Sequence, residues 1–235
     1  MEIEKIDNYI FDERFYCKYQ PDGTRIYHPS VTYILGSAYP SGYGLDHWRG
    51  DVGNKRADEI IEEAGQDGTF VHESIEVILK GGKIEREAIE AKFASKRALK
   101  IMRCLQAFLD WNAEYKPKIG LTEHTVWNDE HGFAGTLDLV CEIEGETYVV
   151  DFKTSKSIHQ QHKAQICAYG LAVKCDKVAL LHLGNTTKKR YSWLVLKPED
   201  REKYTNHFIQ ANQLFRTLNP DAHPSEESYP DIFTL

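Results

Sequence analysis

The stretch that decides the fold is GTLDLVCEIEGETYVVDFKTSKS, residues 135–157. It contains the greater part of two strand-like runs, residues 133–143 and 146–153, which are separated by Glu144-Gly145. A glycine-containing turn between two apolar, β-branched runs is a typical hairpin signal. The sequence therefore predicts an antiparallel pair of strands at the centre of the domain.

Three ionisable residues lie on this predicted hairpin. Asp138 is in its first strand, and Asp151 and Lys153 follow at the end of its second strand. The hairpin would bring Asp138 alongside Asp151, and residues two apart in a strand project from the same face, so Lys153 should join them. We expect two carboxylates and one ammonium group around one point.

This trio has a chemical interpretation and an ordinary one. Carboxylate oxygens suit a hard divalent cation such as Mg²⁺ or Mn²⁺. Such a cation lowers the pKa of a water molecule and neutralises phosphate charge, and a nearby lysine stabilises developing charge. The trio therefore favours phosphodiester hydrolysis. The alternative is a surface hairpin with a common cross-strand Asp–Lys pair.

The next segment favours the chemical interpretation. Residues 157–173 are predicted to form a helix, and Gln161, Gln165 and Tyr169 recur on it at intervals of four. Residues four apart lie on one helix face, so these three should point polar groups toward the strand ends.

The rest of the chain completes an α/β pattern. We predict a short β-like stretch at 30–35, helices at 51–64, 69–80, 85–115 and 198–218, and further strands at 121–127, 177–183 and 190–196. A break is expected between the first two helices, at Gln66-Asp67-Gly68. The order predicts a mixed central β-sheet flanked by helices, with extra N-terminal helices covering one face.

Composition limits the class of protein. The 235 residues are 41% hydrophobic and 28% charged, with a net charge of -7, as in a globular domain and unlike a basic nucleic-acid coat protein. No apolar run is long enough for a membrane span, and the acidic N-terminus resembles neither a signal nor a transit peptide, so we expect a cytoplasmic protein. Five cysteines without a C-x-x-C pair indicate reduced thiols rather than disulfides or an iron–sulfur cluster.

Four motifs, in order, resemble the PD-(D/E)XK nuclease superfamily and specifically its RecB-like exonuclease branch, of the phage or mitochondrial-genome-maintenance type. They are Gly68–His72 (G-x-x-x-H), Gly135–Asp138 (G-x-x-D), Asp151–Lys153 (D-x-K) and Gln165–Tyr169 (Q-x-x-x-Y). Leu137 replaces the proline that precedes the first aspartate in many superfamily members, a replacement common in this branch. The resemblance implies a restriction-endonuclease-like core.

The resemblance also implies roles for individual residues. Asp138, Asp151, the carbonyl of Phe152 and His72 would be metal ligands. Lys153 would be the catalytic lysine.

Other positions would support this site. Gln165 and Tyr169 would hold the site or touch the phosphate backbone, with Gln161 beside them. Glu123 would hold a second metal or have no such role. Glu76 lies one turn from His72 and would orient it, bind metal, or belong to a solvated face.

We therefore expect a single nuclease domain over residues 1–235, with a cap region at 1–67, a core at 68–218 and a tail at 219–235. Its expected activity is Mg²⁺- or Mn²⁺-dependent exonucleolytic cleavage of single-stranded DNA or DNA ends, with one or two metal ions and no iron–sulfur cluster. A structure-specific endonuclease and a DNA-end-binding recombination subunit stay open as alternatives.

Two basic stretches are candidates for contact with DNA phosphates. One is the helical series Lys92, Lys96, Lys100 and Arg103, and the other is Lys188-Lys189-Arg190 at a turn. Each is alternatively a solvated surface.

Overall fold

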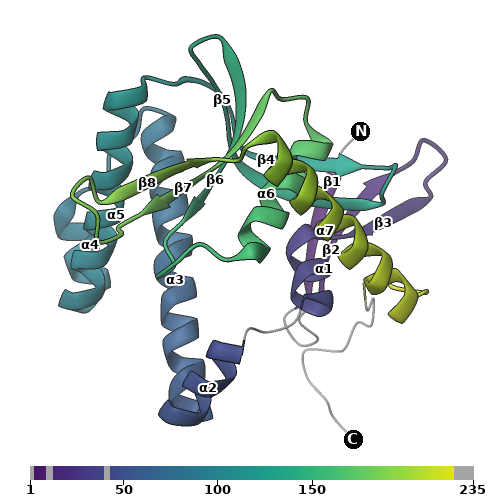
Figure 1. The fold of residues 1–235 in the computed structure, drawn as a ribbon, viewed down its shortest axis with the longest axis horizontal. Helices are drawn as coiled ribbons and strands as arrows, with labels where there is room; N and C mark the ends of the chain where they lie inside the picture. The colour runs from purple at the N-terminus through teal and green to yellow at the C-terminus, as the bar shows by residue number, and fades with distance from the viewer. Residues whose placement is uncertain (1–2, 9–12, 40–42, 225–235) are drawn as a thin grey trace, which may run out of the picture.

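A five-stranded sheet forms the centre of the protein (Figure 1). The computed structural model describes residues 3–8, 13–39 and 43–224. The strands run in the order β4 (Lys118–Asn128), β5 (Phe133–Ile143), β6 (Glu146–Lys153), β7 (Lys177–Leu183) and β8 (Tyr191–Val195). Neighbours are antiparallel except β6 and β7, which pair in parallel. The sheet is therefore mixed, as the sequence predicts.

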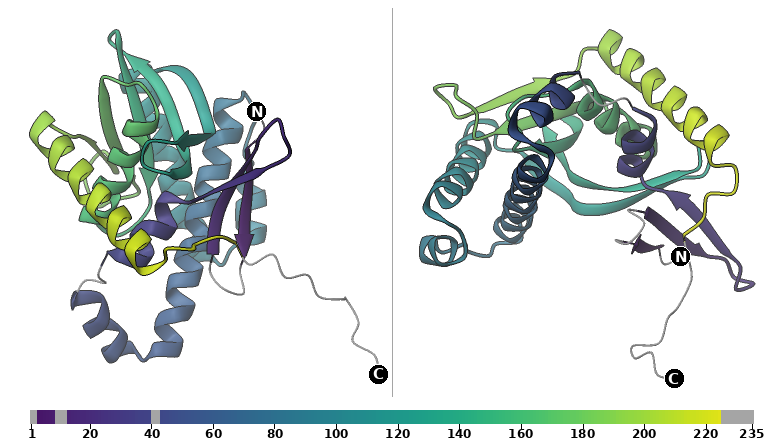
Figure 2. Two further views of the ribbon diagram at one scale, coloured as in Figure 1. Left: turned by 90° about the vertical axis from the view of Figure 1, so that its right-hand side faces the viewer. Right: turned by 90° about the horizontal axis from the view of Figure 1, so that it is seen from below.

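Helices cover both faces of this sheet, as the views in Figure 2 show. One face carries α3 (Asn54–Leu79), α4 (Arg86–Lys92) and α5 (Ser95–Tyr115), and the other carries α1 (Val31–Ala38), α6 (Gln160–Ala172) and α7 (Pro198–Leu218).

Successive residues of the inner strands enter opposite cores. Val149 and Leu180 pack with α6 and α7, whereas Val150 and Leu181 pack with α3 and α5. A strand buried on both faces needs a continuous apolar run, which is what residues 147–150 and 178–181 supply. The predicted α/β fold class is confirmed.

The N-terminal region contains a second sheet that the sequence analysis did not predict. Strands β1 (Ile3–Asn8), β2 (Glu13–Tyr19) and β3 (Arg25–Pro29) pair antiparallel in that order. Tyr16 of β2 bridges to the central sheet, because its hydroxyl lies 2.8 Å from Thr136 Oγ1. A short helix, α2 (Tyr43–Val52), precedes α3.

The β-like prediction at residues 30–35 is wrong, because this segment begins α1. The Ser30 side chain accepts a hydrogen bond from the backbone N–H of Tyr33 at 3.0 Å, which caps the helix. Val31, Ile34 and Leu35 then share one buried helical face. The β-branched residues suggested a strand, but the cap and the helical spacing decide the outcome.

The predicted helix break at 66–68 is also wrong. A single helix, α3, continues through it, and Asp67 is buried within that helix. Arg97 of α5 donates from Nε to the Asp67 carboxylate at 2.7 Å, and Lys100 Nζ lies 3.5 Å from it. This tertiary ion pair offsets the poor helix propensity of Asp67 and Gly68.

The single helix predicted for residues 85–115 is interrupted. Phe93 and Ala94 have extended backbone conformations between α4 and α5. The Phe93 ring packs edge-on against Phe70 of α3, with centroids 4.9 Å apart. Packing against α3 thus favours a corner that helical periodicity alone does not reveal.

Two further features bear on the sequence predictions. All five cysteines are free, and four of them are buried. Among the described residues, no helix combines the length and hydropathy needed to cross a bilayer. Most of the predicted tail, residues 225–235, lies outside the described residues.

Candidate active site

The β5–β6 hairpin places two buried aspartates beside each other. Leu139 pairs with Val150, so the next position along each strand sets Asp138 against Asp151. Both side chains are buried, with exposures of 8% and 2%. The backbone N–H of Phe152 donates to Asp138 Oδ2 at 2.5 Å, which locks the carboxylate to the end of β6.

Lys153 lies on the same face as Asp151. Its Nζ is 2.7 Å from Asp151 Oδ2 and donates to Gln165 Oε1 at 2.9 Å. Gln165 in turn donates from Nε2 to the Tyr169 hydroxyl at 3.2 Å. One face of α6 therefore orients the ammonium group of Lys153. Gln161 is half-buried in the first turn of α6, and its role stays a prediction.

A set of potential metal ligands adjoins this pair. Nδ1 of His72, from the middle of α3, lies 3.2 Å from Asp138 Oδ1. One ligand atom each from His72, Glu123 and Asp138 all lie within 4.8 Å of one another. Asp151 lies next to this set rather than in it. The sequence analysis expected Glu123 to hold a second metal or to have no such role.

Glu123 reaches the site through an unusual backbone conformation. Its φ is 45°, in the left-handed region, although it lies inside β4. Its neighbours Thr122 and His124 pair with Leu139 and Leu137, so Glu123 stands opposite Asp138. Left-handed backbone at a glutamate is costly and is found preferentially at functional sites.

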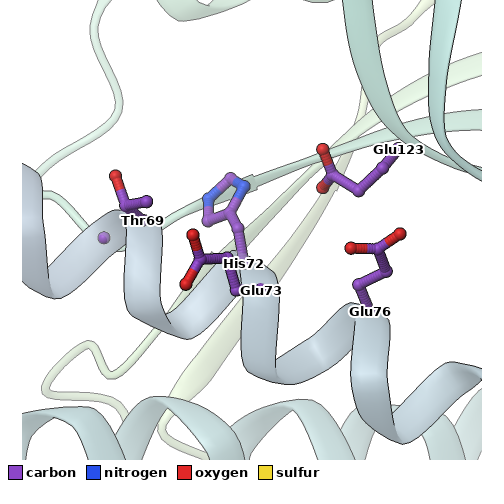
Figure 3. A pocket seen from close by; sticks show the side chains of 6 residues that line it. Thr69, His72, Glu73, Glu76 and Glu123 are labelled. Atoms are coloured by element: carbon purple, nitrogen blue, oxygen red, sulfur yellow. The ribbon is translucent and has the colours of Figure 1, made fainter.

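The ligand set opens into a hollow of about 380 Å³ between α3 and β4. Figure 3 shows His72, Glu76 and Glu123 directed toward it, with Thr69 and Glu73 along the same helix. Glu76 also forms an ion pair with Lys80. The sequence analysis did not single out Thr69 or Glu73, although Thr69 lies three residues from His72 and Glu73 three residues from Glu76, a spacing that could have suggested them.

The donor set fits a hard divalent cation. Its atoms are carboxylate oxygens and one imidazole nitrogen, which Mg²⁺ and Mn²⁺ accept. Asp151 Oδ2 is buried and faces the Lys153 ammonium at 2.7 Å. The Asp151 carboxylate beside Asp138 adds a further oxygen donor that such a cation accepts. The Phe152 carbonyl stays a predicted ligand.

Burial and neighbouring charge shift the titration of these groups. Burial, reinforced by the nearby Asp138 carboxylate, raises the pKa of Glu123 to about 7. Burial likewise raises the pKa of Asp151 despite the attraction of Lys153. The pKa of Asp138 is lowered, because His72 and Lys153 outweigh the effect of burial. Burial lowers the pKa of His72, but Asp138 outweighs it and the net shift is upward.

Two motif glycines allow close approach around this site. A Cβ atom at Gly68 would lie 3.2 Å from Thr154 Oγ1, and one at Gly135 would lie 2.7 Å from Tyr169 Cε1. Gly68 thus lets α3 meet the end of β6, and Gly135 lets the Tyr169 ring lie against β5. Packing therefore explains both glycines.

We expect Glu123→Gln to change how stability depends on pH. In the folded protein the pKa of Glu123 is about 7, whereas in the unfolded chain it is 4.5. Between these two pH values the folded protein keeps a proton that the unfolded chain has released. The free energy of unfolding of the metal-free protein therefore falls as the pH rises from 4.5 to about 7. The variant lacks this loss and should gain a few degrees in Tm relative to wild type between pH 5 and pH 8. Thermal unfolding in EDTA measures this difference.

The same experiment with Mn²⁺ added gives the control. Because a carboxylate ligand must be ionised, Mn²⁺ should stabilise wild type more at pH 8 than at pH 5, and Glu123→Gln should show a smaller gain. Parallel pH profiles for the two proteins in EDTA would contradict the assignment.

Comparisons with known proteins bear on this geometry. No curated protein matches the sequence. Among solved structures, the protein described as "Crystal structure of SSO0001" shares 17% identity over 64% of this chain and 85% of that chain, with a TM-score of 0.35, a likeness too weak to support an argument.

A family match is far more extensive. Residues 45–228 match the family model described as the PD-(D/E)XK nuclease superfamily. The matched region contains the hairpin, α3 with His72, and α6 with Gln165, and it extends over well more than half of the chain. The resemblance drawn from the four motifs is thereby confirmed at the level of the superfamily. This chain belongs to the PD-(D/E)XK nuclease superfamily.

Proposed function

We propose that this nuclease is a DNA exonuclease of the RecB-like type, dependent on Mg²⁺ or Mn²⁺, that degrades single-stranded DNA or DNA ends. Its context would be recombination, repair or replication. The observation that supports this proposal best is the convergence of His72, Glu123 and Asp138 beside the Asp151–Lys153 pair.

Each side chain has a part in the proposed reaction. His72, Glu123, Asp138 and Asp151 would hold one or two divalent cations. A bound cation would supply positive charge against the phosphate and acidify a water molecule.

Lys153 would be the catalytic lysine. Asp151 and Gln165 restrain its Nζ, so the ammonium is fixed before substrate arrives. A fixed ammonium in a partly desolvated site stabilises charge that develops on a phosphate oxygen without reorganising.

The experiment compares end-labelled linear and circular single-stranded DNA in Mg²⁺, Mn²⁺ or EDTA, for wild type and Lys153→Ala. We expect metal-dependent loss of the linear substrate alone, reduced about 10²–10³-fold in the variant. Lys174→Ala, at an exposed lysine beyond the end of α6, serves as the control.

Other outcomes would redirect the proposal. Cleavage of the circle would identify an endonuclease, because an exonuclease needs an end. Binding of DNA without cleavage in any metal would identify a DNA-end-binding subunit instead.

A further inference from the structure

Three cations of the two basic stretches that the sequence offered for DNA are ion-paired within the protein. Lys189 is ion-paired with Glu114 and Arg190 with Asp110. In the other stretch, Lys100 pairs with the buried Asp67. These cations are neutralised by carboxylates of the protein itself and have less charge to offer a phosphate.

A third basic segment lies next to the catalytic lysine. Residues 152–175 contain four lysines and no aspartate or glutamate. Its exposed and half-buried part is the loop between β6 and α6 together with the first turn of α6, residues 154–163, here called the entry strip. It contains two lysines, Lys156 and Lys163. Its other polar side chains are neutral: Thr154, Ser155, Ser157, His159, Gln160, Gln161 and His162.

The two entry-strip lysines are not tied to carboxylates of the described residues. Lys156 is exposed at the middle of the loop. Lys163 lies 5.1 Å above the ring of Tyr204, a contact that leaves its positive charge unpaired. Both charges are therefore available to a polyanion.

The entry strip has a defined conformation. His182 donates from Nε2 to the Ser155 carbonyl at 2.6 Å, and the Ser155 hydroxyl donates to the Ser157 carbonyl at 2.9 Å. His159 and His162 form reciprocal capping hydrogen bonds at the start of α6. These contacts hold the strip before any ligand arrives, which reduces the ordering cost of binding.

Charge is distributed unequally around the site. The hollow on the α3 side is lined by Glu73, Glu76 and Glu123. The entry strip adjoins this acidic hollow, because Thr154 meets α3 at Gly68. The carboxylates of the hollow repel a phosphodiester backbone unless bound cations neutralise those carboxylates. The lysines of the entry strip attract the same backbone.

From this geometry we infer that the entry strip binds the phosphodiester backbone of single-stranded DNA next to the bond that is cleaved, with Lys156 and Lys163 as its charged contacts. This inference rests on the proposed function and names the surface that holds its substrate. The strand would leave Lys153 across the start of α6, away from the acidic wall of α3.

The test measures binding of a labelled single-stranded oligothymidylate by fluorescence anisotropy in EDTA, over a range of salt concentrations, so that binding is separated from cleavage. The double variant Lys156→Gln/Lys163→Gln should bind about tenfold more weakly. The slope of log K against log salt should become shallower by about 1.4, or about 0.7 for each lysine that contacts a phosphate.

The control is Lys116→Gln/Lys174→Gln, which removes the same charge at exposed positions outside the strip. It should retain the wild-type Kd and salt slope. Equal losses in both double variants, an unchanged Kd in the strip variant, or no binding by wild type would each overturn the inference.

Cleavage assays on the same proteins separate the two proposals. A wild type that cleaves DNA but binds it independently of Lys156 and Lys163 refutes the strip and leaves the exonuclease. A wild type that binds through the strip but never cleaves, in Mg²⁺ or Mn²⁺, refutes the exonuclease and leaves the strip.

Discussion

Replacing Asp138 with asparagine is expected to reduce DNA cleavage on the order of 10³-fold while leaving the fold intact. Asp138 contacts both α3 and β6. Its Oδ1 lies 3.2 Å from His72 Nδ1, and its Oδ2 accepts a hydrogen bond from the Phe152 N–H. An asparagine keeps the shape and one acceptor oxygen, so the hydrogen bond to Phe152 can persist. It removes the negative charge that a divalent cation requires.

Two measurements check this expectation. The first is the initial rate on linear single-stranded DNA in Mn²⁺. The second is the rise in Tm on adding Mn²⁺, which should be present in wild type and nearly absent in Asp138→Asn, because a ligand that binds only the folded state stabilises it.

A matched control removes a carboxylate from the same hairpin region. Glu130 lies on the turn between β4 and β5, with its side chain 83% exposed. Glu130→Gln should cleave at the wild-type rate and respond normally to Mn²⁺. If Asp138→Asn also retained the wild-type rate, the hairpin would not be the catalytic centre.

The second large effect is on stability. Gly135→Ala should lower the free energy of unfolding by about 1–3 kcal/mol, because the new methyl group would lie 2.7 Å from Tyr169 Cε1 in a fully packed core. Either β5 or α6 must shift to relieve the overlap. Chemical denaturation of the metal-free protein measures the loss.

A double-mutant cycle tests the cause. Tyr169→Leu removes the ring, so Gly135→Ala should cost clearly less in that background than in wild type. Gly36→Ala is the control, since Gly36 lies on the exposed face of α1 with no neighbouring atom within 4 Å of its Cβ position. Alanine there should stabilise by up to about 1 kcal/mol. Additive effects of Gly135→Ala and Tyr169→Leu would exclude steric overlap with the ring.

The elements of the nuclease core follow closely from the sequence. The bounds predicted for β5, β6, β7 and α7 are those observed, because an apolar run or a helical period of sufficient length is a strong local signal. The four motifs point to the superfamily from the sequence alone. The Asp138–Asp151 juxtaposition also follows, since it depends only on hairpin register.

The errors cluster where distant contacts override local preference. Asp67 and Gly68 signal a helix end, yet Arg97, remote in sequence, pairs with Asp67 and favours a continuous α3. The corner at Phe93 depends on packing against Phe70. The N-terminal sheet was missed because its short strands alternate weakly, although Pro21-Asp22-Gly23 between β2 and β3 is a turn signal.

The sequence by itself therefore determined the class of fold, the superfamily and the trio of Asp138, Asp151 and Lys153, because these depend on periodicity, turn chemistry and spacing along one hairpin. Only the tertiary structure decided that Glu123 joins His72 and Asp138. It also decided that Lys156 and Lys163 have no carboxylate partner among the described residues, whereas Lys100, Lys189 and Arg190 do. The physical reason is that ligand geometry and charge pairing are set by which elements pack together, and that information is distributed over contacts between residues far apart in the chain.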